Sequence, residues 1–254
     1  MESGKVESTI QNGIGTISFF HPQSNSLPGD LLRKLADEIT RIGNDSEAKV
    51  ILLRSEGEKA FCAGASFDEL ISLNSFEKGK YFFSGFASVI NAMRKAPKFV
   101  VARVQGKAVG GGVGLASAAD YTLAMDTASV KLSELAVGIG PFVVGPAVER
   151  KIGSSAFNTL AIDATEWRSA AWAKEKGLYV DIYSSKELLD KAIDTLVNKL
   201  AASNPEAMDL LKKAFWKGTE HWDTLLIERA EMSGKLVLSD FTVNAINKFK
   251  TGVR

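Results

Sequence analysis

Short apolar segments alternate with amphipathic ones along most of this chain, and this alternation constrains the fold more than any other feature. Three segments are rich in β-branched and other apolar residues, as strands are: 16–20, 49–54 and 98–104. Three others space their apolar residues at helical intervals: 28–42, 76–95 and 185–201. Strands that alternate with helices are typical of the α/β class. The chain has no internal repeat or low-complexity linker, so we expect an α/β fold with one continuous core.

The pattern changes at Pro205, after which every segment has helical spacing. Asn204 suits the N-cap of a helix and Pro205 its first position, so we expect successive helices within residues 201–254. These helices carry more apolar residues than a small peripheral bundle would bury alone: Leu210, Leu211, Phe215, Trp216, Leu225, Leu226, Ile227, Leu236 and Val237. We therefore expect this region to face partner subunits.

Charge and composition exclude several classes of protein. The 254 residues carry 31 Lys and Arg against 30 Asp and Glu, without the basic excess that nucleic-acid binding requires. The single Cys62 excludes an intrachain disulfide, and no apolar run approaches the roughly 18 residues of a membrane span. The first ten residues lack the apolar core of a signal peptide, so a cytoplasmic protein is expected. His21 and His221 have no partner at metal-ligand spacing, and no metal is expected.

Four glycines lie within eight residues in "VGGGVGLA", 109–116. A dinucleotide-binding fingerprint is excluded because Leu115 occupies the position of its third glycine, and the chain has no Gly-Lys-Ser/Thr phosphate loop. A close crossing of a helix and a strand would also account for such a cluster. The pattern alone therefore predicts a site where the backbone itself is needed, without identifying the site.

Four motifs occur in the order and spacing of one known family. They are "HPQSNSL" (21–27), "GEKAFCAGASFDEL" (57–70), "VQGKAVGGGVGLASAADYTLA" (104–124) and "VKLSELAVGIGP" (130–141). Together they resemble the crotonase superfamily, the enoyl-CoA hydratase/isomerase family. The resemblance implies a crotonase-like spiral of ββα units over residues 1–200. It also implies that the helical region 201–254 packs against neighbouring subunits in a homotrimer or a dimer of trimers.

The resemblance implies roles for the small residues of these motifs. The backbone amides of Ala65 and Gly111 would stabilise the oxyanion of an enolate formed from an acyl-CoA thioester. The residues expected to bind the substrate are Ala63, Gly64, Ser66, Gly110, Gly112 and Gly114. Ser66 stands where many relatives have an aspartate, so contacts near the CoA moiety differ there. Coenzyme A is part of the substrate, and no separate cofactor is expected.

Glu134 is the leading candidate for proton transfer. Members of the family that hydrate enoyl-CoA use two glutamates, and the second of these falls on Glu134. Its apolar neighbours Leu132, Leu135, Ala136 and Val137 suggest partial burial, which would raise the pKa of the carboxyl group toward neutral pH. Two other residues near these motifs are expected to be structural: Asp120 as a polar support and Cys62 as a small buried hydrophobe.

The first glutamate of the family falls on Gly114, which has no side chain. Hydration of an α,β-unsaturated acyl-CoA is the leading function, because "GGGVGL" (110–115) and the segment 133–153 resemble hydratases of branched substrates such as 3-methylglutaconyl-CoA. A double-bond isomerase that uses one carboxylate is the first alternative. A catalytically silent acyl-CoA-binding protein is the second. Side chains in 71–90 and 139–145 would set the acyl specificity, which the motifs do not fix.

Overall fold

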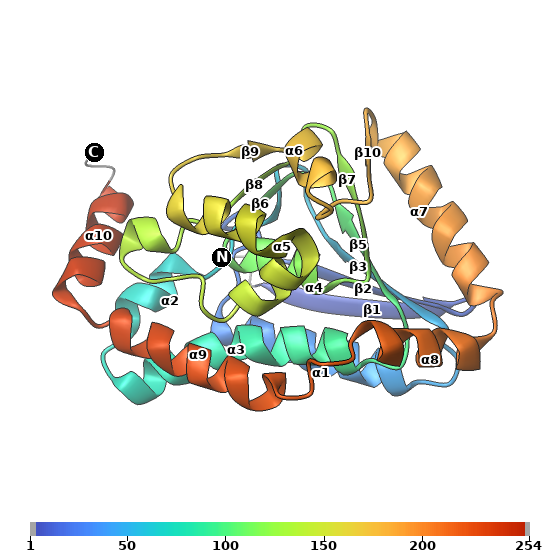
Figure 1. The fold of residues 1–254 in the computed structure, drawn as a ribbon, viewed down its shortest axis with the longest axis horizontal. Coiled ribbons are helices and arrows are strands. Elements are labelled where there is room, and N and C mark those ends of the chain that lie inside the picture. Colours follow the sequence, from blue (N-terminus) through green and yellow to red (C-terminus); the bar gives the residue numbers. More distant parts are fainter. Residues whose placement is uncertain (1–3, 252–254) are drawn as a thin grey trace.

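The computed structural model describes residues 4–251, which form two β-sheets surrounded by helices (Figure 1). The larger sheet has six strands in the order β1 (Lys5–Gln11), β2 (Ile14–Phe20), β3 (Val50–Ser55), β5 (Val100–Val104), β7 (Tyr121–Met125) and β10 (Asp181–Tyr183). The β1–β2 pair is antiparallel, and every other neighbouring pair in this sheet is parallel. The three segments predicted as strands are its central members β2, β3 and β5, so the α/β class is confirmed.

A second sheet positions the glycine-rich segments. Its order is β4 (Ala60–Cys62), β6 (Lys107–Val109), β8 (Ser129–Lys131) and β9 (Arg168–Ser169). The first three strands are parallel, and β9 is antiparallel to β8. The carboxyl ends of β4, β6 and β8 therefore lie at one edge, where they deliver three loops: the turn after Cys62, the turn at Gly110 and the segment from Leu132 onward.

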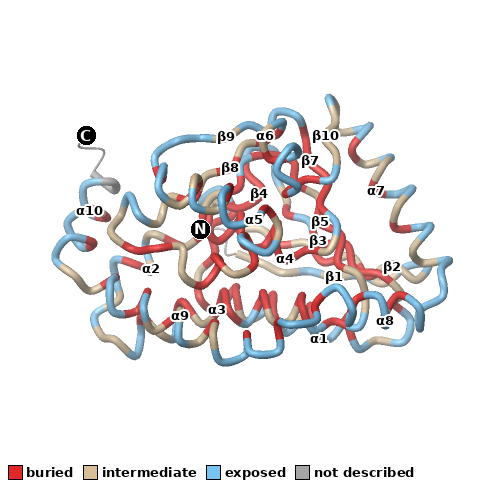
Figure 2. Tube along the Cα trace, viewed as in Figure 1, coloured by how far each residue is buried: buried red, intermediate tan, exposed pale blue. Residues whose placement is uncertain are grey.

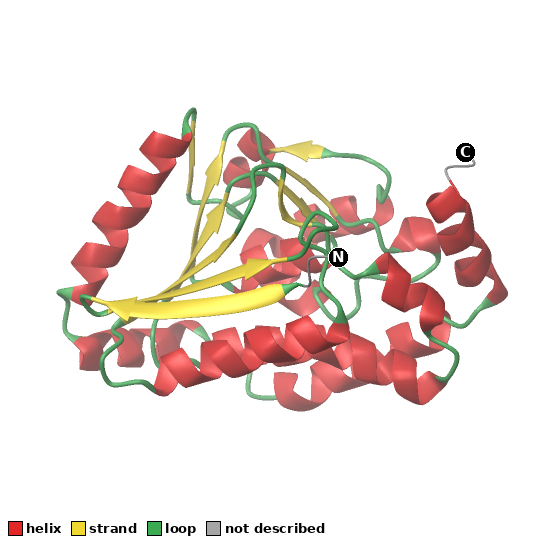
Figure 3. Ribbon diagram, turned by 180° about the vertical axis from the view of Figure 1, so that it is seen from behind, coloured by secondary structure: helices red, strands yellow, loops and turns green. Residues whose placement is uncertain are grey.

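The three predicted long helices are α1 (Gly29–Asn44), α3 (Phe76–Lys95) and α7 (Lys186–Ala201). Ser75 and Ser185 cap α3 and α7 by accepting hydrogen bonds from the backbone N–H groups of Lys78 and Leu188. Figure 3 shows α1 and α3 as a row of helices along the larger sheet. The shorter helices are α2 (Phe67–Ser72), α4 (Gly111–Ala118), η1 (Leu135–Val137), α5 (Gly145–Ile162) and α6 (Ala170–Glu175). Every residue of α4 is buried, and Figure 2 shows the buried core around it.

Three helices follow Pro205, namely α8 (Pro205–Phe215), α9 (Trp222–Leu236) and α10 (Asp240–Thr251). Asn204 caps α8 by accepting hydrogen bonds from the next helical N–H groups. Helix α9 packs lengthwise on α3 of the same chain (Figure 1).

The apolar residues expected to face partner subunits divide into three groups by their burial. Trp216, Leu226 and Val237 are buried in this chain's own core, so for these three the expectation is wrong. Leu225 and Ile227 are half-buried against the same core. The residues that remain exposed are Leu210, Leu211, Phe215 and Leu236.

Candidate active site

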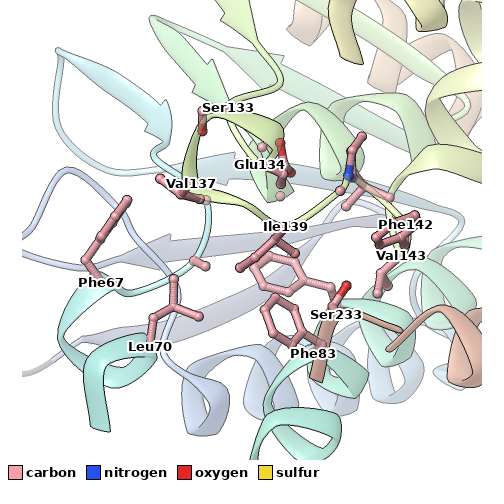
Figure 4. Close-up of a pocket in the computed structure, with 18 of the residues that line it drawn as sticks. Phe67, Leu70, Phe83, Ser133, Glu134, Val137, Ile139, Phe142, Val143 and Ser233 are labelled. Atoms are coloured by element: carbon pink, nitrogen blue, oxygen red, sulfur yellow. The ribbon is translucent and has the colours of Figure 1, made fainter. Parts of the chain in front are cut away.

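A cavity lies where the carboxyl edge of the second sheet meets α3 and α9 (Figure 4). Its walls are formed by the turn after β4, the start of α4, the segment 133–144 and side chains from α2, α3 and α9. Among the described residues that line it, three have polar side chains: Ser133, Glu134 and Ser233. The other lining residues are glycine, alanine, proline or large hydrophobes. This is the composition of a site for a largely apolar ligand.

The glycine cluster places the N-terminus of α4 in this cavity. Gly110 has a φ of 51°, a left-handed conformation that disfavours other residues, and its N–H donates to Lys131 O over 2.9 Å. Gly111 begins the helix, and its N–H donates to no described residue. An unpaired amide at a helix N-terminus attracts negative charge, because the helix dipole adds to the N–H dipole.

The turn after β4 supplies a second unpaired amide. The N–H of Ala63 donates to Ser24 O, and that of Ser66 donates to Leu27 O. Between them, the N–H of Ala65 donates to none of the residues that the structure describes. The turn therefore leaves one amide free on the cavity wall.

Gly64 brings the two amides together. Its φ is 83°, and a Cβ atom at this position would lie 2.8 Å from Val109 O and 3.3 Å from Gly111 N. The turn after β4 therefore touches the start of α4 in a way that only glycine allows. Ala65 and Gly111 line the same cavity as a result.

The carboxyl group of Glu134 is enclosed at this cavity. The residue as a whole is half-buried, but Oε2 is buried and has no hydrogen-bond partner among the described residues. A Cβ atom on Gly110 would lie 2.8 Å from Oε1, so the carboxyl group rests directly on the glycine backbone. Burial raises the pKa of Glu134 to about 7, in the direction expected from the sequence.

The carboxyl group of Glu134 is not enclosed by the four apolar sequence neighbours from which its burial was predicted. Leu135 and Ala136 are exposed, and Val137 is half-buried. Of the four, Leu132 alone is fully buried. The carboxyl group is enclosed instead by contact with Gly110, which is distant in sequence and is brought close by the β6–β8 pairing.

Six of the nine predicted site residues line the cavity: Ala63, Gly64, Ala65, Gly110, Gly111 and Glu134. The other three, Ser66, Gly112 and Gly114, do not. Ser66 is buried and accepts a hydrogen bond from Glu69 N as the N-cap of α2. A Cβ atom at Gly112 would lie 2.4 Å from Cys62 O, so this glycine allows α4 to pack on β4.

Gly114 packs against Val144. A Cβ atom at Gly114 would lie 2.5 Å from Val144 Cγ1 and 2.7 Å from its Cβ. Val144 itself lines the cavity. The isopropyl group of Val144 thus occupies the space that a longer side chain at Gly114 would need.

The sequence motifs did not identify most of the apolar wall. Phe83 and Phe86 come from α3, within the range 71–90, and Phe142, Val143 and Val144 come from the range 139–145. These ranges were predicted to set specificity, but no pattern marked the individual residues. Ser233, on α9, had no sequence signal at all.

Asp120 and Cys62 have the structural roles expected of them. The side chain of Asp120 is buried and accepts hydrogen bonds from Lys212 Nζ over 2.7 Å and from Trp216 Nε1 over 2.8 Å, which ties α8 to the main sheet. Burial raises the pKa of the Cys62 thiol to about 12, so it is not a thiolate nucleophile near neutral pH. No cluster of metal-ligating side chains occurs among residues 4–251 for which side chains are described. Within the same part of the chain, no helix is long and apolar enough to span a bilayer.

Comparison with known proteins gives consistent matches over nearly the whole chain. The profile of the family described as "Enoyl-CoA hydratase/isomerase" matches residues 9–248. The chain is 29% identical over 252 residues to the short-chain-enoyl-CoA hydratase of Clostridium acetobutylicum, covering 98% of this chain and 95% of that protein. It is 32% identical over 206 residues to the mitochondrial methylglutaconyl-CoA hydratase of Mus musculus, covering 77% of this chain and 63% of that protein.

The same fold occurs in solved structures. A crystal structure of enoyl-CoA hydratase from Bacillus halodurans superposes with a TM-score of 0.88 at 22% identity, covering 95% of this chain and 98% of that one. At this identity the likeness concerns the fold alone. It shows that the two-sheet arrangement with its surrounding helices is shared.

Proposed function

Since the chain belongs to the enoyl-CoA hydratase/isomerase family, we propose that it adds water to an α,β-unsaturated acyl-CoA. One observation carries the proposal: the buried carboxyl group of Glu134 shares a cavity with the two unpaired backbone amides of Ala65 and Gly111. Such a set can hold a thioester oxygen at one point and move a proton at another. Coenzyme A enters as part of the substrate, and the reaction needs no separate cofactor.

The two amides act on the thioester carbonyl. Attack of water on C3 moves an electron pair through C2 onto the carbonyl oxygen and produces an enolate. The N–H groups of Ala65 and Gly111 donate hydrogen bonds to this developing oxyanion, and the α4 dipole adds to the second. Losing one such donor typically costs about 2.7–4 kcal/mol of transition-state stabilisation.

Glu134 moves the proton. In its ionised form it removes a proton from water as the hydroxyl group adds to C3, and in its protonated form it then delivers a proton to C2. A carboxyl group with a pKa of about 7 has substantial populations of both forms near neutral pH. The apolar cavity that raises this pKa therefore also suits the group to act first as base and then as acid.

A double-bond isomerase is the second candidate, and the contact between Gly114 and Val144 favours it. Gly114 has no side chain, and Val144 fills the space beside it, so this position offers no second carboxylate to hold water. A single carboxylate can remove a proton from C2 of a 3-enoyl-CoA, next to the thioester carbonyl, and deliver it to C4 without adding oxygen. Both reactions place negative charge on the thioester oxygen, so both use the same pair of amides.

Product analysis in ¹⁸O-water separates the candidates. A hydratase converts 2-butenoyl-CoA into a 3-hydroxyacyl-CoA that carries one solvent oxygen. An isomerase instead converts a 3-enoyl-CoA into the 2-enoyl isomer without label. Hydration is refuted if no 2-enoyl substrate yields a labelled product, and the absence of any turnover with bound thioester would leave an acyl-CoA-binding protein.

The exposed apolar residues of α8 support a proposed self-association as a homotrimer or a dimer of trimers. Leu210, Leu211 and Phe215 are each about half exposed and lie within two turns of one helix. A contiguous apolar face of this kind is typical of an interface between subunits. Light scattering at micromolar concentration tests this proposal, and a monomer would contradict it.

A further inference from the structure

Ser233 is a buried polar residue whose side chain has no partner among the described residues. It is 2% exposed, it lines the cavity from α9, and its hydroxyl group makes no hydrogen bond with a described residue. Two buried or helix-surface serines elsewhere bond instead to the carbonyl group four residues earlier in their own helix: Ser88 to Ser84 O over 3.0 Å and Ser117 to Val113 O over 2.8 Å. The Ser233 hydroxyl is therefore left available to a molecule in the cavity.

A close helix crossing holds Ser233 in this position. A Cβ atom at Gly79 of α3 would lie 2.8 Å from Gly234 O, and one at Gly234 would lie 2.5 Å from Lys80 N. The two helix backbones therefore touch at the residue next to Ser233. The ion pair between Lys80 Nζ and Glu231 Oε1, 2.5 Å long, joins the same two helices. This contact brings α9 close enough for a side chain as short as serine to reach the cavity.

The cavity is polar at two separated places. Figure 4 shows Glu134 and Ser233 on opposite sides, with Ile139 between them and Phe83 beside Ser233. A thioester held next to Glu134 would extend its acyl chain along this apolar wall. The distal part of the chain would then meet a hydroxyl group at the end of an otherwise apolar path.

The group that meets Ser233 must be uncharged. None of the described residues that line the cavity is Lys, Arg or His. Burying a carboxylate without a cationic partner is costly, and the ionised form of Glu134 would repel it as well. A carbonyl or hydroxyl group pairs with Ser233 at no such cost, whereas a hydrocarbon leaves the serine unsatisfied.

From these contacts we propose that Ser233 determines acyl specificity by hydrogen bonding a neutral carbonyl or hydroxyl group on the distal part of the acyl chain. The proposal rests on the function proposed above, because it places the thioester beside Glu134. It predicts a preference for acyl-CoA substrates with a neutral polar group over matched hydrocarbons, and over matched carboxylates most of all.

Binding of saturated CoA thioesters, which cannot be hydrated, tests the contact by titration calorimetry. The probes are two ketones, 4-oxopentanoyl-CoA and 5-oxohexanoyl-CoA, with their methyl-branched isosteres 4-methylpentanoyl-CoA and 5-methylhexanoyl-CoA. Succinyl-CoA and glutaryl-CoA are the carboxylate counterparts. The wild-type protein should bind the ketone about 3- to 10-fold more tightly than its isostere at one length or both, as expected for one neutral hydrogen bond. The carboxylates should bind most weakly.

Ser233→Ala should abolish the preference for the ketone and leave the affinity for the hydrocarbon unchanged or higher. Ser88→Ala is the matched control, because Ser88 bonds to its own helix and does not line the cavity. The proposal is overturned if the ratio of the two affinities is the same in Ser233→Ala and wild type, or if the wild type prefers the hydrocarbon at both lengths. It is also overturned if the wild type binds none of the six thioesters. If the saturated thioesters bind in the expected pattern but 2-butenoyl-CoA is not turned over, hydration is refuted and the Ser233 contact is still supported.

Discussion

Replacing Glu134 by glutamine should remove most of the activity and, at the same time, stabilise the protein at alkaline pH. The amide has nearly the shape of the carboxyl group but cannot transfer a proton, so turnover should fall by about 10²–10⁴-fold while CoA thioesters still bind. The stabilisation follows from burial, which raises the pKa of Glu134 from 4.5 to about 7. A tenfold change in acid strength is worth about 1.4 kcal/mol, so ionising this group in the folded protein costs about 3 kcal/mol more than in the unfolded chain.

The sign of this effect fixes its pH dependence. Below pH 4.5 the carboxyl group is protonated in both states, so wild type and Glu134→Gln should have similar stability. Between pH 4.5 and about 7 the unfolded chain loses its proton while the folded protein retains it, and the wild type loses stability relative to the variant. Above pH 7 the difference should stay constant at about 3 kcal/mol in favour of Glu134→Gln.

Urea denaturation at pH 4.5, 6 and 8 measures the difference directly, with kcat/KM determined on the same preparations. Glu47→Gln is the control. It removes the same formal charge as Glu134→Gln, but from a side chain that is exposed to solvent. It should change neither stability nor turnover. A Glu134→Gln variant that retains full activity, or whose stability relative to wild type does not rise between pH 4.5 and 8, would refute the buried general acid and base.

Three further perturbations test the packing, two of them around the site and one where α8 meets the main sheet. Gly114→Ala should destabilise the protein by about 1–3 kcal/mol because its methyl group meets Val144, and Val144→Ala in the same chain should recover part of this loss, as measured by urea denaturation. Gly110→Ala should lower both turnover and melting temperature, since a side chain there requires a positive φ and displaces the Glu134 carboxyl group. Lys212→Met should cost about 3–5 kcal/mol by leaving its buried carboxylate partner unpaired, whereas the exposed Lys213→Met should cost less than about 0.5 kcal/mol.

The sequence by itself determined where several helices begin and end, and it marked the glycine-rich segment whose backbone forms part of the site. The periodicity of 76–95 predicts α3 to the residue, and that of 185–201 predicts α7 to within one residue, because side chains three and four apart decide which face of a helix is buried. Asn204 and Pro205 mark the start of α8 for equally local reasons. The glycines at 110–112 indicated either a site that uses the backbone or a close helix–strand crossing, and the structure contains both: Gly111 lines the cavity, and Gly112 lets α4 pack on β4.

Only the tertiary structure decided which side chains share the cavity. Phe215 and Trp216 are adjacent and both apolar, yet one is about half exposed while the other is buried near Asp120. The contact between Val144 and Gly114 likewise depends on how α4 packs against the segment before α5. Ser233 reaches the cavity because α3 and α9 cross in contact at Gly79 and Gly234, which are 155 residues apart in sequence (234 − 79). Local periodicity fixes the face that a helix buries, but the depth and position of a crossing depend on the packing of both helices, which no single segment encodes.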